Sequence, residues 1–164
     1  MEIVRKFRAN FNSSEEVLLF IRICLFITAL PLLIRFLTLR QLMKVLTWPA
    51  SGFSGNRHDE DYKESIVKFT DYILTRNFWI YKTTCLKRSL ALYHFLHRVV
   101  ADMHICFGVR LKIDSPIQKR AKVLEGHAWL MHNGEIFSDG NPDITSTYTV
   151  TYCFPESIAS AKNL

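Results

Sequence analysis

The sequence lacks several patterns that would assign it quickly to a functional class. Its four cysteines, at positions 24, 85, 106 and 153, form no CxxC pair, and no secretory cleavage signature is present. This predicts free thiols in a reducing cytoplasm. No GxxxxGK[ST] phosphate loop, HExxH pair, internal repeat or low-complexity tract occurs. We therefore expect neither a cofactor nor a metal, and the histidines at 94 and 97 alone are a weak metal signal.

Charged residues are few, at 22% of the 164 positions, and hydrophobic residues make up 49%. A chain of this kind fits one domain with a real core and is neither disordered nor a multi-span membrane protein. The net charge of +6 is uneven: residues 1–50 hold seven Lys and Arg against three acids, and residues 51–164 hold fourteen against twelve. The basic excess thus lies beside the most hydrophobic segment, which indicates an anionic membrane surface rather than nucleic acid as a partner.

The N-terminal segment is apolar and reads as helical. Residues 13–16 have the pattern of a capping box, and the apolar stretch 17–39 follows, interrupted by Arg22 and Arg35. Its uncharged run of twelve residues is too short to span a bilayer comfortably, and Pro31 is expected to split it into two helices. Three roles stay open: a helical hairpin packed on the domain core, a membrane-surface helix, or a partner-docking surface.

A Gly, Pro and Ser-rich loop at residues 48–56 predicts a boundary between an N-terminal helical segment, residues 1–50, and a catalytic domain, residues 51–164. After a helix with an acidic first turn, apolar spacing and a threonine cap predict a second helix that starts near Cys85 and ends near Asp102. Exposed N–H groups at a helix start favour the thiolate, the form of cysteine that attacks a carbonyl.

The remaining elements are strands and loops. Alternating residues predict a strand over 105–113, a polar basic loop over 114–124, and a further strand over 148–152. Of the other cysteines, those at 24 and 106 are expected to be buried and inert, and the one at 153 buried or partly exposed.

Between these strands, residues 126–140 have the pattern of a β-hairpin around an Asn-Gly turn. With a two-residue loop, the numbers of opposed residues sum to 267, so His127 faces Gly140 and Asp139 points to the other face, which excludes a catalytic pair. With a three-residue loop and Gly134 in a G1 bulge, His127 lies opposite Asp139, roughly 5 Å away at Cβ. A carboxylate at that distance orients an imidazole. The expected pair therefore requires the three-residue loop.

These residues carry a resemblance to a known family. Cys85-Leu86 with Arg88-Ser89-Leu90-Ala91-Leu92, then Gly108-Val109, His127-Ala128-Trp129, Gly134 and Asp139 resemble the transglutaminase-like leader peptidases of lasso peptide biosynthesis. The likeness covers roughly the last hundred residues and extends to Phe154-Pro155 and to the hydrophobic, Arg-flanked N-terminal segment.

The resemblance implies an α+β, papain-like fold in which the cysteine helix packs on an antiparallel sheet. It also implies a cysteine protease that removes the leader from a ribosomally made precursor peptide, with Cys85 as nucleophile, His127 as base and Asp139 as its orienting partner. A separate leader-binding protein and a macrocyclase would be its partners. Two alternatives stay open: transfer of the acyl group to an amine, as in true transglutaminases, and a non-catalytic module that only binds a peptide.

Overall fold

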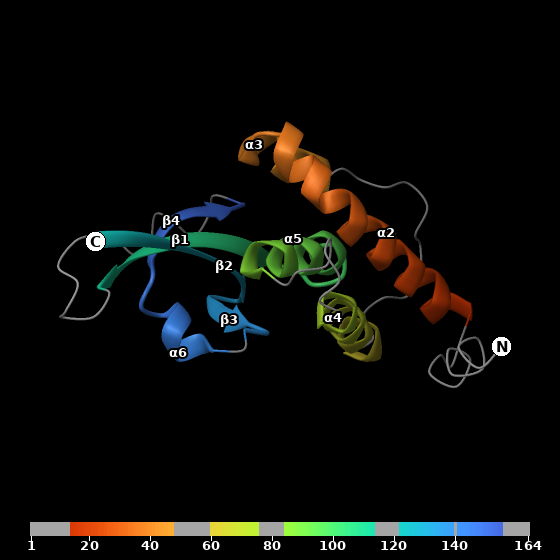
Figure 1. Ribbon diagram of the computed structural model, residues 1–164. Helices are drawn as coiled ribbons and strands as arrows, with labels where there is room; N and C mark the ends of the chain where they lie inside the picture. The colour runs from red at the N-terminus through yellow and green to blue at the C-terminus, as the bar shows by residue number, and fades with distance from the viewer. Residues whose placement is uncertain (1–13, 48–59, 76–83, 114–121, 140, 156–164) are drawn as a thin grey trace. The chain divides into compact units, whose positions relative to one another are not determined.

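The computed structural model describes residues 14–47, 60–75, 84–113, 122–139 and 141–155. The chain forms two compact units, residues 1–83 and residues 84–164, and Figure 1 labels their elements. The domain division predicted after residue 50 falls outside the described residues and stays a prediction.

The first unit is helical. Its elements are α2 (Ser14–Phe36), α3 (Leu39–Leu46) and α4 (Glu60–Thr75). The predicted break at Pro31 is wrong, because α2 continues through the proline. Pro31 lacks one backbone N–H donor, and the helix continues past it. The break comes after Phe36, where Thr38 caps the start of the next helix. There Thr38 Oγ1 accepts from the Gln41 N–H at 3.4 Å, and Gln41 Oε1 accepts from the Thr38 N–H at 3.0 Å, which is a capping box.

Helix α2 packs against α4, where the Phe20 and Phe69 rings meet edge to face at 5.6 Å, and its Leu19, Ile23 and Ile27 side chains are buried. At 23 residues, with a mean hydropathy of 2.7 in its most apolar window, α2 is long and apolar enough to cross a membrane by length and composition. The sequence-based expectation that it is too short counted only the uncharged run. Core helices of soluble proteins share these properties, so length and composition do not assign α2 to a membrane.

The second unit is an α+β structure, as predicted. A four-stranded antiparallel sheet has the order β3-β2-β1-β4, and α5 packs on β2 and β1 (Figure 1). Its elements are α5 (Cys85–Leu96), β1 (Met103–Ile113), β2 (Lys122–His132), β3 (Glu135–Phe137), α6 (Pro142–Thr145) and β4 (Thr149–Phe154). This arrangement places the helix that starts at the cysteine directly on the strand that carries the histidine.

Two predicted boundaries in this unit are wrong. Helix α5 ends at Leu96 rather than near Asp102, because the N–H groups of Val99 and Val100 both bond to the Leu96 carbonyl and close the helix with a turn. The basic loop predicted to reach residue 124 is shorter, since β2 already begins at Lys122.

The hairpin between β2 and β3 has a two-residue turn. Leu130 pairs with Phe137 and His132 with Glu135, so paired numbers sum to 267, and the three-residue loop is wrong. Asn133 and Gly134 both have positive φ, at 51° and 83°, which is the combination that a type I′ turn requires.

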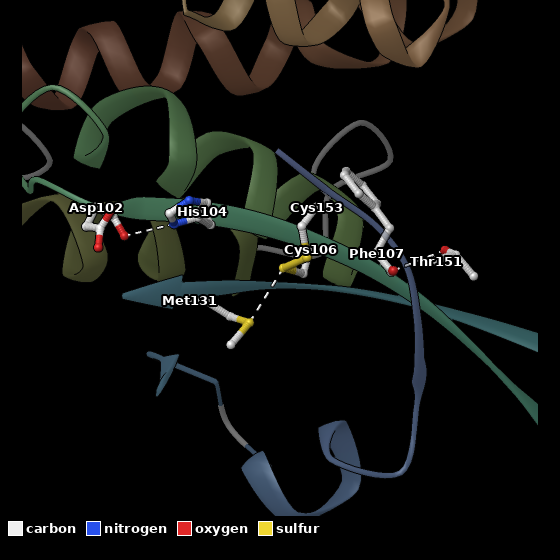
Figure 2. Close-up of a disulfide and its surroundings, with 7 residues drawn as sticks. All are labelled: Asp102, His104, Cys106, Phe107, Met131, Thr151 and Cys153. Atoms are coloured by element: carbon white, nitrogen blue, oxygen red, sulfur yellow. Dashed lines mark hydrogen bonds between the residues drawn. A yellow bond between two sulfur atoms is a disulfide. The ribbon is translucent and has the colours of Figure 1, made fainter. Parts of the chain in front are cut away.

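The prediction of four free thiols is also wrong. Cys106 of β1 and Cys153 of β4 are directly paired in the sheet and are joined by a disulfide (Figure 2). Both are buried, and Cys106 Sγ lies 3.5 Å from Met131 Sδ within a core cluster that also contains Trp129. The spacing of the cysteines in the sequence does not predict this disulfide, because the pairing of β1 with β4 brings the two residues together.

Candidate active site

Cys85 is the first residue of α5. Thr84 caps the helix, its Oγ1 accepting from the Lys87 N–H at 3.3 Å. The first N–H groups of a helix have no acceptor within the helix, so the backbone around Cys85 presents donors suited to an anion. Cys85 is a half-buried cysteine outside any disulfide, as is Cys24 of the other unit. The predicted helix start and its threonine cap are both confirmed.

His127 lies on β2 and packs against two aromatic rings, those of Trp129 and Tyr148, which together form an aromatic wall. Its ring centroid is 5.8 Å from that of Trp129, with the two rings nearly parallel, and 5.0 Å from that of Tyr148. Trp129 occupies the space where Gly108 has no side chain: a Cβ there would lie 2.7 Å from Trp129 Cη2. The glycine on β1 therefore allows the tryptophan to pack beside His127 and to limit water around the imidazole.

His127 and Asp139 are in contact, although the register is the one expected to keep them apart. Nε2 of His127 lies 3.3 Å from Oδ2 of Asp139, and both side chains are about four-fifths buried, with exposed fractions of 20% and 17%. The contact is possible because β3 ends at Phe137 and Ser138 takes a positive φ of 50°, which turns Asp139 out of the strand. The inference that a two-residue turn excludes the pair assumed that the strand continues to residue 139.

This contact gives the two ring nitrogens of His127 different roles. With Nε2 directed at the carboxylate, Nδ1 is the nitrogen left to exchange a proton with a thiol. A carboxylate that holds the Nε2–H also stabilises the imidazolium form once Nδ1 is protonated.

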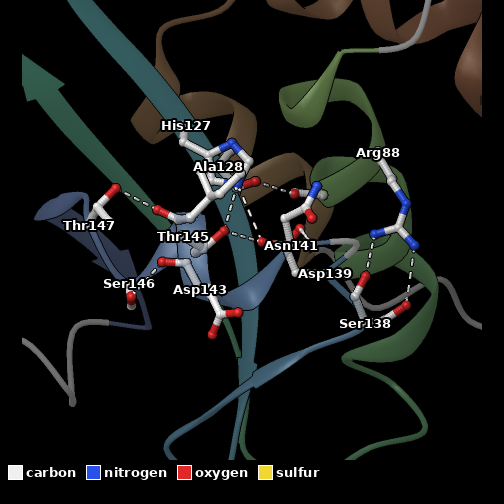
Figure 3. A network of polar contacts seen from close by, with 12 residues as sticks. Arg88, His127, Ala128, Ser138, Asp139, Asn141, Asp143, Thr145, Ser146 and Thr147 are labelled. Atoms are coloured by element: carbon white, nitrogen blue, oxygen red, sulfur yellow. Dashed lines mark hydrogen bonds and ion pairs between the residues drawn. The ribbon is translucent and has the colours of Figure 1, made fainter. Parts of the chain in front are cut away.

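A third polar residue joins the pair, and sequence reasoning missed it. Thr145 of α6 is buried, and its Oγ1 donates to Asp139 Oδ2 and lies 3.1 Å from His127 Nε2 (Figure 3). The Asn141 N–H donates to the other carboxylate oxygen, Oδ1, at 3.4 Å. No spacing or motif distinguishes Thr145 in the sequence.

These hydrogen bonds decide the charge of Asp139. Burial raises the pKa of Asp139, but hydrogen bonds from Thr145, from His127 and from the Asn141 N–H outweigh burial, so the pKa of Asp139 lies below its ordinary value. Asp139 is therefore an ionised carboxylate near neutral pH, and two side-chain donors converge on its Oδ2.

Tyr148 connects the aromatic wall to a charged pair. The guanidinium of Arg110 lies 4.5 Å from the Tyr148 ring centroid and donates to Glu125 Oε2 from Nε at 2.9 Å. Burial raises the pKa of Tyr148 above its ordinary value; Arg110 opposes this effect, and Glu125 and Cys85 add to it. The Tyr148 ring adjoins that of His127 and so links the Arg110–Glu125 pair to the site.

A family model described as the Transglutaminase-like superfamily matches residues 26–153, which is more than half of the chain. The chain belongs to the transglutaminase-like superfamily. No curated protein and no solved structure matches it. This superfamily generally has cysteine protease and transferase members, so membership suggests an activity of one of these types. The antiparallel sheet with a helix that starts at a cysteine agrees with a transglutaminase-like fold.

In the second unit the structure joins two of the three predicted site residues directly. His127 contacts Asp139, and Cys85 begins the helix that packs on β2, but within the described residues no hydrogen bond links the Cys85 thiol to His127. The catalytic roles of the three residues stay predictions. Among the described residues, no group of three or more His, Cys, Asp or Glu side chains could hold a metal ion.

Proposed function

We propose that this chain is a cysteine peptidase that removes the leader from a ribosomally synthesised precursor peptide of the lasso type. One observation carries the proposal: in a member of the transglutaminase-like superfamily, the Cys85 helix packs against the strand that carries His127, and His127 contacts Asp139 in a largely buried pair. The resemblance of the motifs around these residues to lasso leader peptidases supports the substrate class.

The proposed reaction is acyl transfer to water. The Cys85 thiolate attacks the carbonyl at the leader–core junction, and the tetrahedral oxyanion is met by the N–H of Cys85 at the start of α5. His127, protonated at Nδ1, gives its proton to the leaving amine as the peptide C–N bond breaks. A water molecule, deprotonated by His127, then attacks the thioester and releases the carboxylate product and the thiolate. Asp139 holds the Nε2–H throughout.

The proposed partners follow from this substrate. The resemblance to lasso leader peptidases supports a separate leader-binding protein that presents the precursor and a macrocyclase that receives the core. We propose no nucleic-acid partner.

Mass spectrometry of the precursor incubated with the chain and the leader-binding protein tests the proposal. Cleavage should add one water to the summed product masses, whereas transfer of a carboxamide acyl group to an amine releases ammonia. The Cys85→Ala variant should lose cleavage, and Cys24→Ala, which removes the other cysteine outside the disulfide, should retain it. Cleavage by Cys85→Ala at the wild-type rate would contradict the proposal, and no turnover by the wild type would favour a peptide-binding module.

We propose that the chain lies in the cytoplasm, where the buried Cys106–Cys153 disulfide would have to resist reduction, with peripheral contact at the inner face of the membrane through α2. Leu18, Ile21, Leu25, Leu32 and Phe36 are exposed on one face of this helix, with Arg22 and Arg35 on either edge. No acidic residue occurs in α2 and α3 after Glu16, so the surface suits anionic headgroups.

Flotation with phosphatidylglycerol-containing vesicles tests this localisation on the full chain. Leu25→Gln together with Leu32→Gln should abolish co-flotation. Leu124→Gln, at a residue of β2 that is also exposed, should leave it unchanged. Equal flotation of all three proteins, or none by the wild type, would contradict membrane contact through α2.

A further inference from the structure

Two consecutive residues of α5 bind the segments that carry His127 and Asp139. Arg88 reaches Ser138, the residue before Asp139, and Ser89 reaches Ala128, the residue after His127. Both belong to the stretch that follows Cys85 in the resemblance described above, and the proposed reaction assigns neither of them a role.

Arg88 holds the turn that directs Asp139 toward His127. Its Nη1 donates to the Ser138 carbonyl at 2.5 Å and its Nη2 to Ser138 Oγ at 3.2 Å (Figure 3). Ser138 has a φ of 50°, a conformation that residues other than glycine seldom adopt without support. Hydrogen bonds from a charged guanidinium are among the stronger ones in proteins. The contact therefore stabilises the backbone conformation on which the His127–Asp139 contact depends.

Ser89 bonds to β2 at a position where β3 no longer pairs with this strand. Among the described residues, β3 pairs with β2 only from Leu130 to His132. Two positions before this pairing, the Ala128 carbonyl accepts from Ser89 Oγ at 2.8 Å, and both residues are buried. A buried carbonyl without a partner is costly, so the serine both satisfies the carbonyl and fixes the distance between α5 and β2.

Both contacts act about one helical turn from the nucleophile. Arg88 and Ser89 follow Cys85 by three and four residues, which corresponds to roughly 5 Å along a rigid helix. A small shift of α5 would move the thiol relative to the imidazole by a similar amount, and misplacement of reacting groups by about 1 Å can cost about a hundredfold in rate.

We infer that Arg88 and Ser89 are positioning residues that hold the start of α5, and with it the Cys85 thiol, in register with the His127–Asp139 pair. Arg88 acts through the turn at Ser138, and Ser89 acts through β2 at Ala128. This inference rests on the proposed function, because it assumes that Cys85 and His127 act as a pair.

The test is the rate at which iodoacetamide alkylates Cys85 in the full chain, read by peptide mass spectrometry near pH 6 and near pH 9. Near pH 6 the rate reports on the paired thiolate, whereas near pH 9 a thiol ionises without help. Arg88→Met and Ser89→Ala should each slow alkylation near pH 6 by about tenfold or more and leave the rate near pH 9 within about twofold of the wild type. Arg88→Lys, which keeps the charge but not the two-pronged contact, should fall between Arg88→Met and the wild type.

Matched controls separate positioning from a general loss of structure. Thr151→Val removes another hydroxyl that donates to a strand carbonyl, that of Phe107 at 3.1 Å (Figure 2), and Arg98→Met removes another cation just after α5. Both controls should alkylate like the wild type at both pH values. A variant that reacts abnormally at both pH values has lost its fold, and the milder Arg88→Lys then decides the role of the arginine.

The possible failures are distinguishable. Suppose that wild-type Cys85 reacts faster than Cys24 near pH 6, and that Cys85 in Arg88→Met and in Ser89→Ala reacts as fast as in the wild type. The positioning role is then wrong, and the proposed function stands. If wild-type Cys85 reacts no faster than Cys24, the proposed function fails, and the positioning role fails with it.

Discussion

Replacing Thr145 with valine should damage the site without disturbing its shape. Valine has nearly the same volume as threonine but lacks the hydroxyl that donates to Asp139 Oδ2 and lies 3.1 Å from His127 Nε2. Thr145 is 2% exposed, so water has little access to replace the lost donor. Loss of a hydrogen bond to a charged group costs about 1.5–3 kcal/mol.

The same loss should appear in catalysis and in stability. If the hydroxyl supports the pair in the transition state, about 1.5–3 kcal/mol corresponds to a fall in kcat of roughly ten- to a hundredfold, with KM little changed. Thr145→Ser keeps the hydroxyl and should stay within about threefold of the wild type. Kinetics of precursor cleavage measure the first effect, and urea unfolding of all three proteins measures the second.

The pH dependence of unfolding gives a check that needs no substrate. Because hydrogen bonds lower the pKa of Asp139 in the folded chain, the stability that they contribute is present above the ordinary aspartate value and is lost as pH falls through the folded pKa. The deficit of Thr145→Val should therefore be full near neutral pH and should shrink in acid below pH 3.8, the ordinary value. Wild-type kcat in Thr145→Val, or a deficit that does not change with pH, would refute the reasoning.

Three further predictions concern the frame of the second unit. Gly108→Ala should lower the unfolding free energy by about 1–3 kcal/mol, because its Cβ would meet a tryptophan ring and a backbone oxygen within 3 Å, while Gly126→Ala, with open space around it, should not. Burial raises the pKa of Tyr93 to about 12, so absorbance near 295 nm should show that Tyr93 ionises at a higher pH than an ordinary tyrosine. The contribution of Tyr93 to stability should be lost as pH rises through that value. Without reductant, alkylation of the unfolded chain should leave Cys106 and Cys153 unmodified, and reduction should lower the unfolding free energy by about 4 kcal/mol in the chain-entropy model.

Local signals in the sequence predicted the elements that local physics determines. The threonine cap and apolar spacing located the start of α5, and strict alternation located β1. Thr38 and Gln41 have the spacing of a capping box, and the helix break lies there rather than at Pro31. The end of α5 was missed because turn hydrogen bonds to Leu96 leave no composition signal.

The site itself depended on features that pairwise spacing does not contain. The Asn-Gly pair predicts a turn correctly, but the turn has two residues, so the three-residue loop expected from a His127–Asp139 contact is wrong. The contact arises instead from the positive φ of Ser138, which the arginine at position 88 supports across fifty residues of sequence. The contacts of Thr145 with His127 and Asp139, and the Cys106–Cys153 disulfide, likewise arise from tertiary packing.

The most direct test of the central claim is the alkylation of Cys85 across pH in the wild type and in His127→Ala, read site by site by peptide mass spectrometry. The account predicts that Cys85 reacts much faster than Cys24 below neutral pH and that this advantage disappears without His127. Equal rates for the two thiols in the wild type, or an advantage that survives in His127→Ala, would contradict a Cys85–His127 pair.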